Sequence, residues 1–110
     1  MVIMNNNVIN TINNSFGSNC SWGKIFNFIQ DVAEKTLTKK EFYKFLELTN
    51  NEVELCDGED GHLVNGHYYD WKEFDIKRDD MVNDFLDIFD NVSSTTKSKV
   101  IDAVINALNK

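Results

Sequence analysis

In the first half of the chain, hydrophobic residues recur three and four positions apart, the spacing that places them on one face of an α-helix. This pattern predicts a helix from about Met4 to Phe16, which Gly17 ends as a left-handed C-cap. A second helix is predicted from Ser21, as N-cap, to about Lys35, and its broad apolar face indicates a central helix. The residues of that face are Trp22, Ile25, Phe26, Ile29, Val32 and Ala33.

A capping box marks the start of a third helix. Thr38 is followed three residues later by Glu41, so each side chain can accept a hydrogen bond from the backbone N–H of the other residue. The apolar spacing carries this helix to about Thr49. Beyond it, Val53 and Leu55 alternate with glutamates, and this period of two predicts a short, half-buried strand.

A β-hairpin is predicted around Asn65 and Gly66, because this pair readily adopts the positive φ that both central positions of a type I′ turn require. Its arms begin near His62 and His67. The expected register places His62 opposite Tyr69, so the two histidines do not face each other across the strands.

The second arm of the hairpin is expected to continue through Trp71 towards Phe74 and Ile76. Tyr68, Tyr69 and Trp71 cannot all point inwards from a strand, so at least one is expected to be partly exposed. Tyrosine and tryptophan are common at binding hot spots, which makes this group a candidate contact surface. The acidic residues around it are Asp70, Glu73 and Asp75.

A fourth helix is predicted to begin at Asp79 or Asp80 and to carry a row of aspartates. Asp80, Asp84 and Asp87 share one face with Asn91, while the opposite, core face holds Val82, Phe85, Leu86 and Phe89. No lysine interrupts the row, so its carboxylates are expected to repel one another in the free protein. Met81 and Ile88 lie at the margin of the row, where a partner could reach them.

The polar run 93–96 is expected to end the fourth helix and to cap a fifth, from about Thr95 to Asn109. Lys97 and Lys99 lie near its start, where positive charge is slightly unfavourable. The prediction is therefore a single α+β domain over residues 1–110, mostly helical, with about five helices and a small antiparallel β-hairpin between the third and fourth. The hydrophobic stripe of the last helix consists of Val100, Ile101, Val104, Ile105 and Leu108.

The net charge of −7 is concentrated in one segment. Residues 57–90 contain eleven acids and three bases, a net −8, and the remaining residues carry a net +1. The negative electrostatic potential of this segment disfavours direct binding to nucleic acid or to an anionic membrane, and it favours a basic protein partner. Cys20 and Cys56 are far apart, and no apolar run reaches the length of a signal or a membrane span, so a cytoplasmic location is expected.

No metal, cofactor or catalytic site is predicted. Asp57, Glu59 and Asp60 precede His62 and His67, but their spacing does not match an EF-hand loop, and solvated turn residues are the favoured interpretation. A nucleophile elbow, a phosphate loop and a glycine fingerprint are all missing from the sequence. We therefore expect a binding protein and no enzyme.

The segment 37–42, LTKKEF, resembles the capped helix openings of helical immunity proteins. In its small size, acidity and helical build, the chain also resembles the immunity proteins of colicin-type and contact-dependent inhibition systems. This resemblance implies an antitoxin of bacterial competition that neutralises a basic nuclease toxin by occluding its nucleic-acid-binding surface. From the residues themselves, the expected partner-binding positions are Tyr68, Tyr69, Asp70, Trp71, Glu73, Asp75, Asp80, Asp84 and Asp87.

Three other functions remain open from the sequence. A phage DNA mimic or anti-restriction inhibitor would use the same electrostatics, although its carboxylates would be expected along both sides of an elongated surface. A small metal-dependent hydrolase would depend on His62 and His67. An adaptor subunit would use its acidic face for solubility alone. The substrate of the target, RNA or DNA, is open as well.

Overall fold

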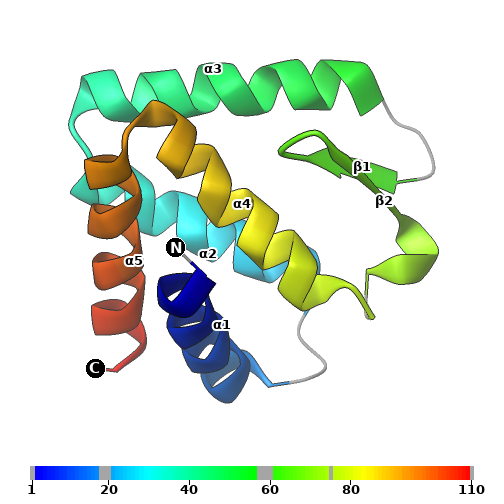
Figure 1. Cartoon of the computed structure of the whole chain (residues 1–110), viewed down its shortest axis with the longest axis horizontal. Helices are drawn as coiled ribbons and strands as arrows, with labels where there is room; N and C mark the ends of the chain where they lie inside the picture. Colours follow the sequence, from blue (N-terminus) through cyan, green and yellow to red (C-terminus); the bar gives the residue numbers. More distant parts are fainter. Residues whose placement is uncertain (1, 18–20, 57–60, 75, 110) are drawn as a thin grey trace.

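Helix α4 (Arg78–Val92) runs through the middle of the molecule, and the other elements pack around it (Figure 1). The computed structural model describes residues 2–17, 21–56, 61–74 and 76–109, and the side chains of 6–17, 21–49, 61–70, 72–74 and 76–109. Within these ranges it contains five α-helices and one antiparallel hairpin between α3 and α4, which confirms the predicted fold class. The remaining elements are α1 (Val2–Phe16), α2 (Trp22–Thr36), α3 (Lys39–Cys56), β1 (Gly61–Val64), β2 (His67–Asp70), the 3-10 helix η1 (Trp71–Glu73) and α5 (Ser94–Leu108).

Phenylalanine rings form the centre of the core. Phe85 of α4 contacts Phe26 of α2 and Phe45 of α3, with ring centroids 4.8 and 5.6 Å away. Phe45 also stacks on Phe89, one turn along α4, at 4.3 Å. The rings thus join three helices, and both α2 and α4 contribute a buried face to this centre.

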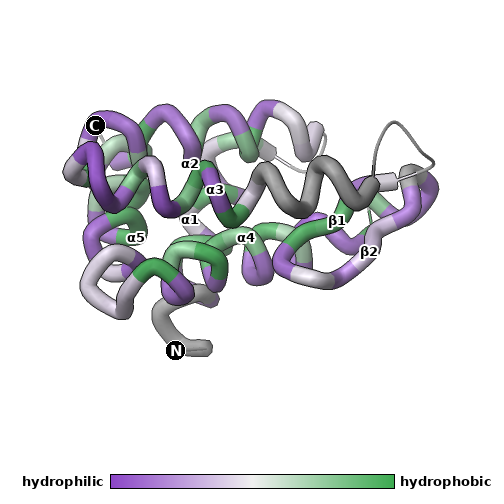
Figure 2. Tube along the Cα trace, turned by 90° about the horizontal axis from the view of Figure 1, so that it is seen from above, coloured by the Kyte–Doolittle hydropathy of each residue, from purple (hydrophilic) through white to green (hydrophobic). Residues whose placement is uncertain are grey.

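Helix α4 is buried on more than its predicted face. Met81 and Ile88, which were expected at the exposed margin of the aspartate row, are both buried. The reason is that α1, α3, α5 and β1 all pack against this one helix. In Figure 2 its hydrophobic stretches alternate with hydrophilic ones, whereas β2 is hydrophilic throughout.

Helix α3 starts as predicted but ends later. The N–H of Glu41 donates to Thr38 Oγ1 at 3.2 Å, and the N–H of Thr38 donates to Glu41 Oε1 at 3.0 Å, which completes the capping box. The helix then continues to Cys56, so the strand predicted around Val53 and Leu55 is wrong. Extending a helix that is already nucleated is easy, and the alternating residues include glutamate and leucine, which are good helix formers.

The hairpin has the predicted turn and register. Asn65 and Gly66 adopt φ of 50° and 84°, and His62 pairs with Tyr69. On the outer face, the ring of Tyr68 lies across Gly61, where an added Cβ would be 2.8 Å from the ring and 2.1 Å from the Tyr69 carbonyl oxygen. The hairpin therefore requires glycine at this position.

The strand does not continue beyond Asp70, contrary to the prediction. The N–H of Asp70 donates to Glu73 Oε1 at 3.1 Å, and the N–H of Lys72 donates to Asp70 Oδ1 at 2.9 Å. These local bonds offer the backbone an alternative to strand pairing and turn it into η1. Helix α4 then begins after Lys77, so Asp79 and Asp80 lie in its first turn and neither is its N-cap.

Ser93 joins α4 to α5, as the polar run predicted. Its N–H donates to the Phe89 carbonyl at 3.1 Å, and its Oγ accepts from the N–H of Thr96 at 3.0 Å. Helix α5 runs from Ser94 to Leu108, with the predicted stripe facing the core. No helix among the described residues is long and apolar enough to cross a membrane.

Candidate interaction site on the hairpin and helix α4

The inner face of the hairpin meets α4 at Asp84. Its Oδ2 atom accepts hydrogen bonds from the Tyr69 hydroxyl and from Nδ1 of His67, the latter at 2.9 Å. Asp84 is only 9% exposed. One carboxylate therefore holds two residues of β2 against α4, and Asn91 adds a bond of 3.2 Å to Asn65 at the turn.

The Tyr69 hydroxyl stays protonated in this setting. Burial raises the pKa of Tyr69, and the hydrogen bond to Asp84 raises it further. The negative charges of Asp84, Asp80 and Glu73 act in the same direction. Tyr69 is thus a permanent donor in the anchor between hairpin and helix.

An open hollow of about 320 Å³ lies beside this anchor. Tyr68, from β2, is 50% exposed, and Asp80, from α4, is also exposed. Within the described part of the chain, no ion pair joins Asp80 to a base. An aromatic ring near an unpaired carboxylate suits a lysine or arginine side chain. The hollow is lined by His67, Tyr68, Tyr69, Lys77, Asp80, Asn83 and Asp84.

The structure brings only part of the predicted site together. Tyr68, Tyr69, Asp80 and Asp84 surround the hollow, but Tyr69 and Asp84 are buried. Asp87 instead accepts a hydrogen bond from Lys97 of α5 at 2.7 Å. The positive charge of Lys97, expected to be slightly unfavourable near the start of its helix, is therefore compensated by a carboxylate. Asp70 and Glu73 bond to the backbone around η1. The side chain of Trp71 and all of Asp75 lie outside the described residues.

The two histidines occupy separate environments. Trp22 Nε1 donates to His62 Nδ1 at 3.4 Å, and burial lowers the pKa of His62, so the imidazole is neutral at pH 7. His67 belongs to the Asp84 anchor. The acidic segment 57–60, predicted to form a turn, lies outside the described residues. Among the described residues there is no group of three or more potential metal ligands.

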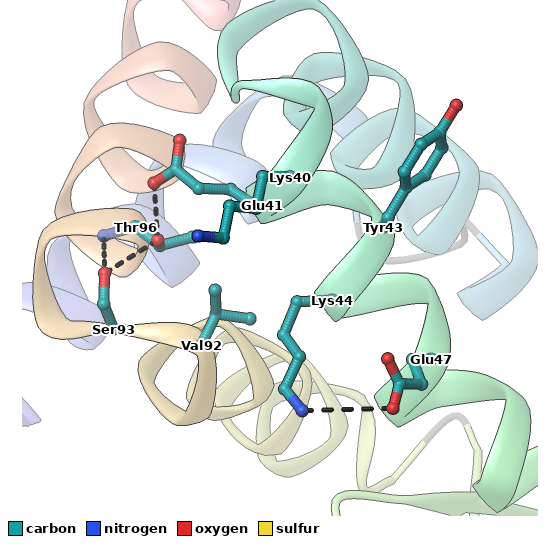
Figure 3. Close-up of a pocket in the computed structure, with 8 residues that line it drawn as sticks. All are labelled: Lys40, Glu41, Tyr43, Lys44, Glu47, Val92, Ser93 and Thr96. Carbon is teal, nitrogen blue, oxygen red and sulfur yellow. Dashed lines mark hydrogen bonds and ion pairs between the residues drawn. The ribbon is translucent and has the colours of Figure 1, made fainter.

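A second hollow, of about 470 Å³, lies where α3 passes the junction of α4 and α5 (Figure 3). Glu41 holds this corner together: it accepts hydrogen bonds from Thr96 at 2.7 Å and from Lys99 at 3.1 Å. The bonds from Thr96 and from the Thr38 backbone lower the pKa of Glu41 to about 2. Tyr43, which is 64% exposed, also lines this hollow. It was not among the predicted contact residues, although it falls outside the apolar stripe of its helix.

A comparison of this chain with protein-family models, with curated proteins and with solved structures finds no match in any of the three.

Proposed function

We propose that this protein is an inhibitor that binds a basic protein, and specifically an immunity protein that neutralises a nuclease toxin in the cytoplasm. The observation that supports this most directly is the hollow between Tyr68 and Asp80, in which an exposed ring lies near an unpaired carboxylate. Tyrosine is one of the residues on which binding energy concentrates, and the carboxylate attracts the basic groups that a nuclease uses to hold phosphates.

The proposed mechanism is occlusion. The segment 57–90 carries a net −8, which would speed the encounter with a basic surface. Once the partner is bound, Asp80 would occupy a phosphate position and Tyr68 would supply the desolvated contact. Asp84 would act indirectly, because both His67 and Tyr69 already bond to its Oδ2 atom. Asp87 has a similar structural role through Lys97.

The test begins with capture of partners from an extract of the organism that encodes this chain, at low and moderate salt. Each retained protein is identified, purified and assayed for cleavage of RNA and DNA with and without the inhibitor. We expect one basic protein at equal stoichiometry whose nuclease activity is blocked. A retained protein that cleaves nucleic acid unhindered, or no basic protein at low salt, would overturn the proposal.

Two variants then locate the surface. Asp80→Asn should lower the association rate about tenfold at low salt, since rim charges act mainly on encounter. Tyr68→Ala should raise the dissociation rate by at least about tenfold, as expected for a hot spot. Asp102→Asn removes another exposed carboxylate, from α5, and serves as the control, with both rates expected to be unchanged.

A further inference from the structure

A separate hollow of about 250 Å³ opens at the start of α2. Its walls come from α2, from β1 and from the segment that follows η1. None of the residues predicted to bind a partner lines this hollow. The residues that line it are Trp22, Gly23, Phe26, Asn27, His62 and Phe74.

The walls of this hollow are aromatic. Phe26 makes T-shaped contacts with Trp22 and His62, at centroid distances of 5.8 and 6.0 Å, and Trp22 and His62 are 6.5 Å apart. Rings arranged edge to face expose both faces and edges to a neighbour. A flat aromatic guest can continue the same packing.

A single direction of hydrogen bonding follows from the contact between Trp22 and His62. An indole N–H only donates, so His62 Nδ1 must be the acceptor, and the neutral ring carries its proton on Nε2. His62 therefore has one remaining donor, and the amide of Asn27 is the other polar side chain of the lining. Because His62 lines the hollow, a guest with an acceptor atom can accept this hydrogen bond in place of water.

Gly23 has no packing reason to be glycine. It lies in the first turn of α2, its φ is not positive, and a Cβ built there would meet no atom within 4 Å. Glycine weakens a helix relative to alanine, so the position carries a cost that the free protein does not explain. Close approach of a guest to the backbone would account for it.

We propose that this hollow binds a small planar heterocycle that presents a hydrogen-bond acceptor to His62. The volume of about 250 Å³ suits one ring system and is below the range of about 300 to 1,000 Å³ of pockets for larger ligands. A phenylalanine side chain has no acceptor and a tryptophan side chain only donates, so a free heterocycle matches the lining better than either. The proposal does not depend on the proposed inhibitor function.

The test is a pair of NMR titrations of the whole protein, with 3-methylpyridine and with toluene. The two probes have nearly the same shape, and only the first has an acceptor. At about pH 8 both the pyridine nitrogen and the imidazole are neutral. We expect shifts at the Trp22 indole N–H and the Gly23 amide, and an affinity for 3-methylpyridine, relative to that for toluene, that is about tenfold higher in the wild-type protein than in His62→Phe.

Variants decide whether the hollow is the site. Gly23→Leu should place a side chain in the open space and abolish binding while leaving the Tm equal or higher, because an added Cβ would meet no atom within 4 Å and leucine is a better helix former than glycine. Asn10→Leu adds the same side chain on an exposed position of α1 and should leave binding unchanged. His62→Phe, which lacks the donor, should bind toluene as the wild-type protein does and 3-methylpyridine about tenfold more weakly.

Three results would overturn the proposal: no shift with either probe, the same ratio of the two affinities in the wild-type protein and in His62→Phe, or full binding in Gly23→Leu. If Gly23→Leu instead lowers the Tm, the interpretation of Gly23 as a position kept open for a guest is wrong.

Discussion

The ammonium group of Lys97 lies 2.7 Å from Oδ1 of Asp87 and joins the start of α5 to α4. Lys97 is buried, whereas the side chain of Asp87 is 38% exposed. A buried ammonium without its carboxylate is costly, so Asp87 stabilises the fold whatever else it contacts. An aspartate that looked like part of a binding row is needed by the protein itself.

We therefore expect Asp87→Asn to lower the free energy of unfolding by about 2 kcal/mol, less than for a fully buried pair because Asp87 is partly solvated. Urea denaturation measures the change. Adding Lys97→Met should recover most of it, since the buried charge is then gone. Asp90→Asn, at an exposed position of the same helix, is the control. Equal effects of Asp87→Asn and Asp90→Asn would show that the ion pair contributes nothing.

Removing the Tyr69 hydroxyl should loosen the hairpin. Tyr69→Phe deletes a donor to a buried carboxylate, which costs about 2 kcal/mol. Amide hydrogen exchange in β1 and β2 should speed up more than exchange in α2. A uniform change across the chain would contradict the role of Tyr69 as the anchor of the hairpin.

The raised pKa of Tyr69 also leads to a prediction about protein stability at alkaline pH. Its pKa in the folded state is raised above the unfolded value of about 10, so its contribution to stability is complete below pH 10 and is lost as the pH rises beyond it. The wild-type protein should therefore lose stability above about pH 10 faster than Tyr69→Phe does. Thermal unfolding from pH 8 to 11 measures both slopes, and parallel curves would contradict the prediction.

The lowered pKa of Glu41 leads to a prediction about protein stability at acidic pH. Its pKa falls to about 2 in the folded state, so its stabilising contribution is present above the unfolded value near 4.5 and is lost as the pH falls towards 2. Glu41→Gln should cost about 1 to 2 kcal/mol at pH 7, through the capping box and the bonds to α5, and much less near pH 2. Urea denaturation at both pH values tests this. A constant difference would contradict it.

The hairpin should not tolerate a side chain at Gly61. Gly61→Ala places Cβ against the Tyr69 carbonyl, which is backbone and cannot move aside, so we expect a loss of at least about 2 kcal/mol and altered shifts along both strands. Gly23→Ala is the control, because its φ is not positive and an added Cβ would meet no atom within 4 Å. Equal destabilisation by the two variants would contradict the packing of Tyr68 across Gly61.

Interactions between residues close together in the sequence were enough to predict several elements correctly. The capping box of Thr38 and Glu41 and the turn of Asn65 and Gly66 involve groups within three residues of one another, so no distant contact was needed to place them. The end of α3 and the turn into η1 were missed for a related reason. At both places a strand and a helical conformation were possible, and the alternation of residue types did not show which of the two would form.

The sequence by itself determined the helical fold class, the hairpin with its register and the face of α4 that carries the aspartates. Only the tertiary structure decided what covers that face, because helical periodicity gives the direction of a side chain and not its neighbours. Asp84 became an anchor because β2 packs on it, and Asp87 became an ion-pair partner because α5 does. Tyr68 and Asp80 remained exposed around the same hollow.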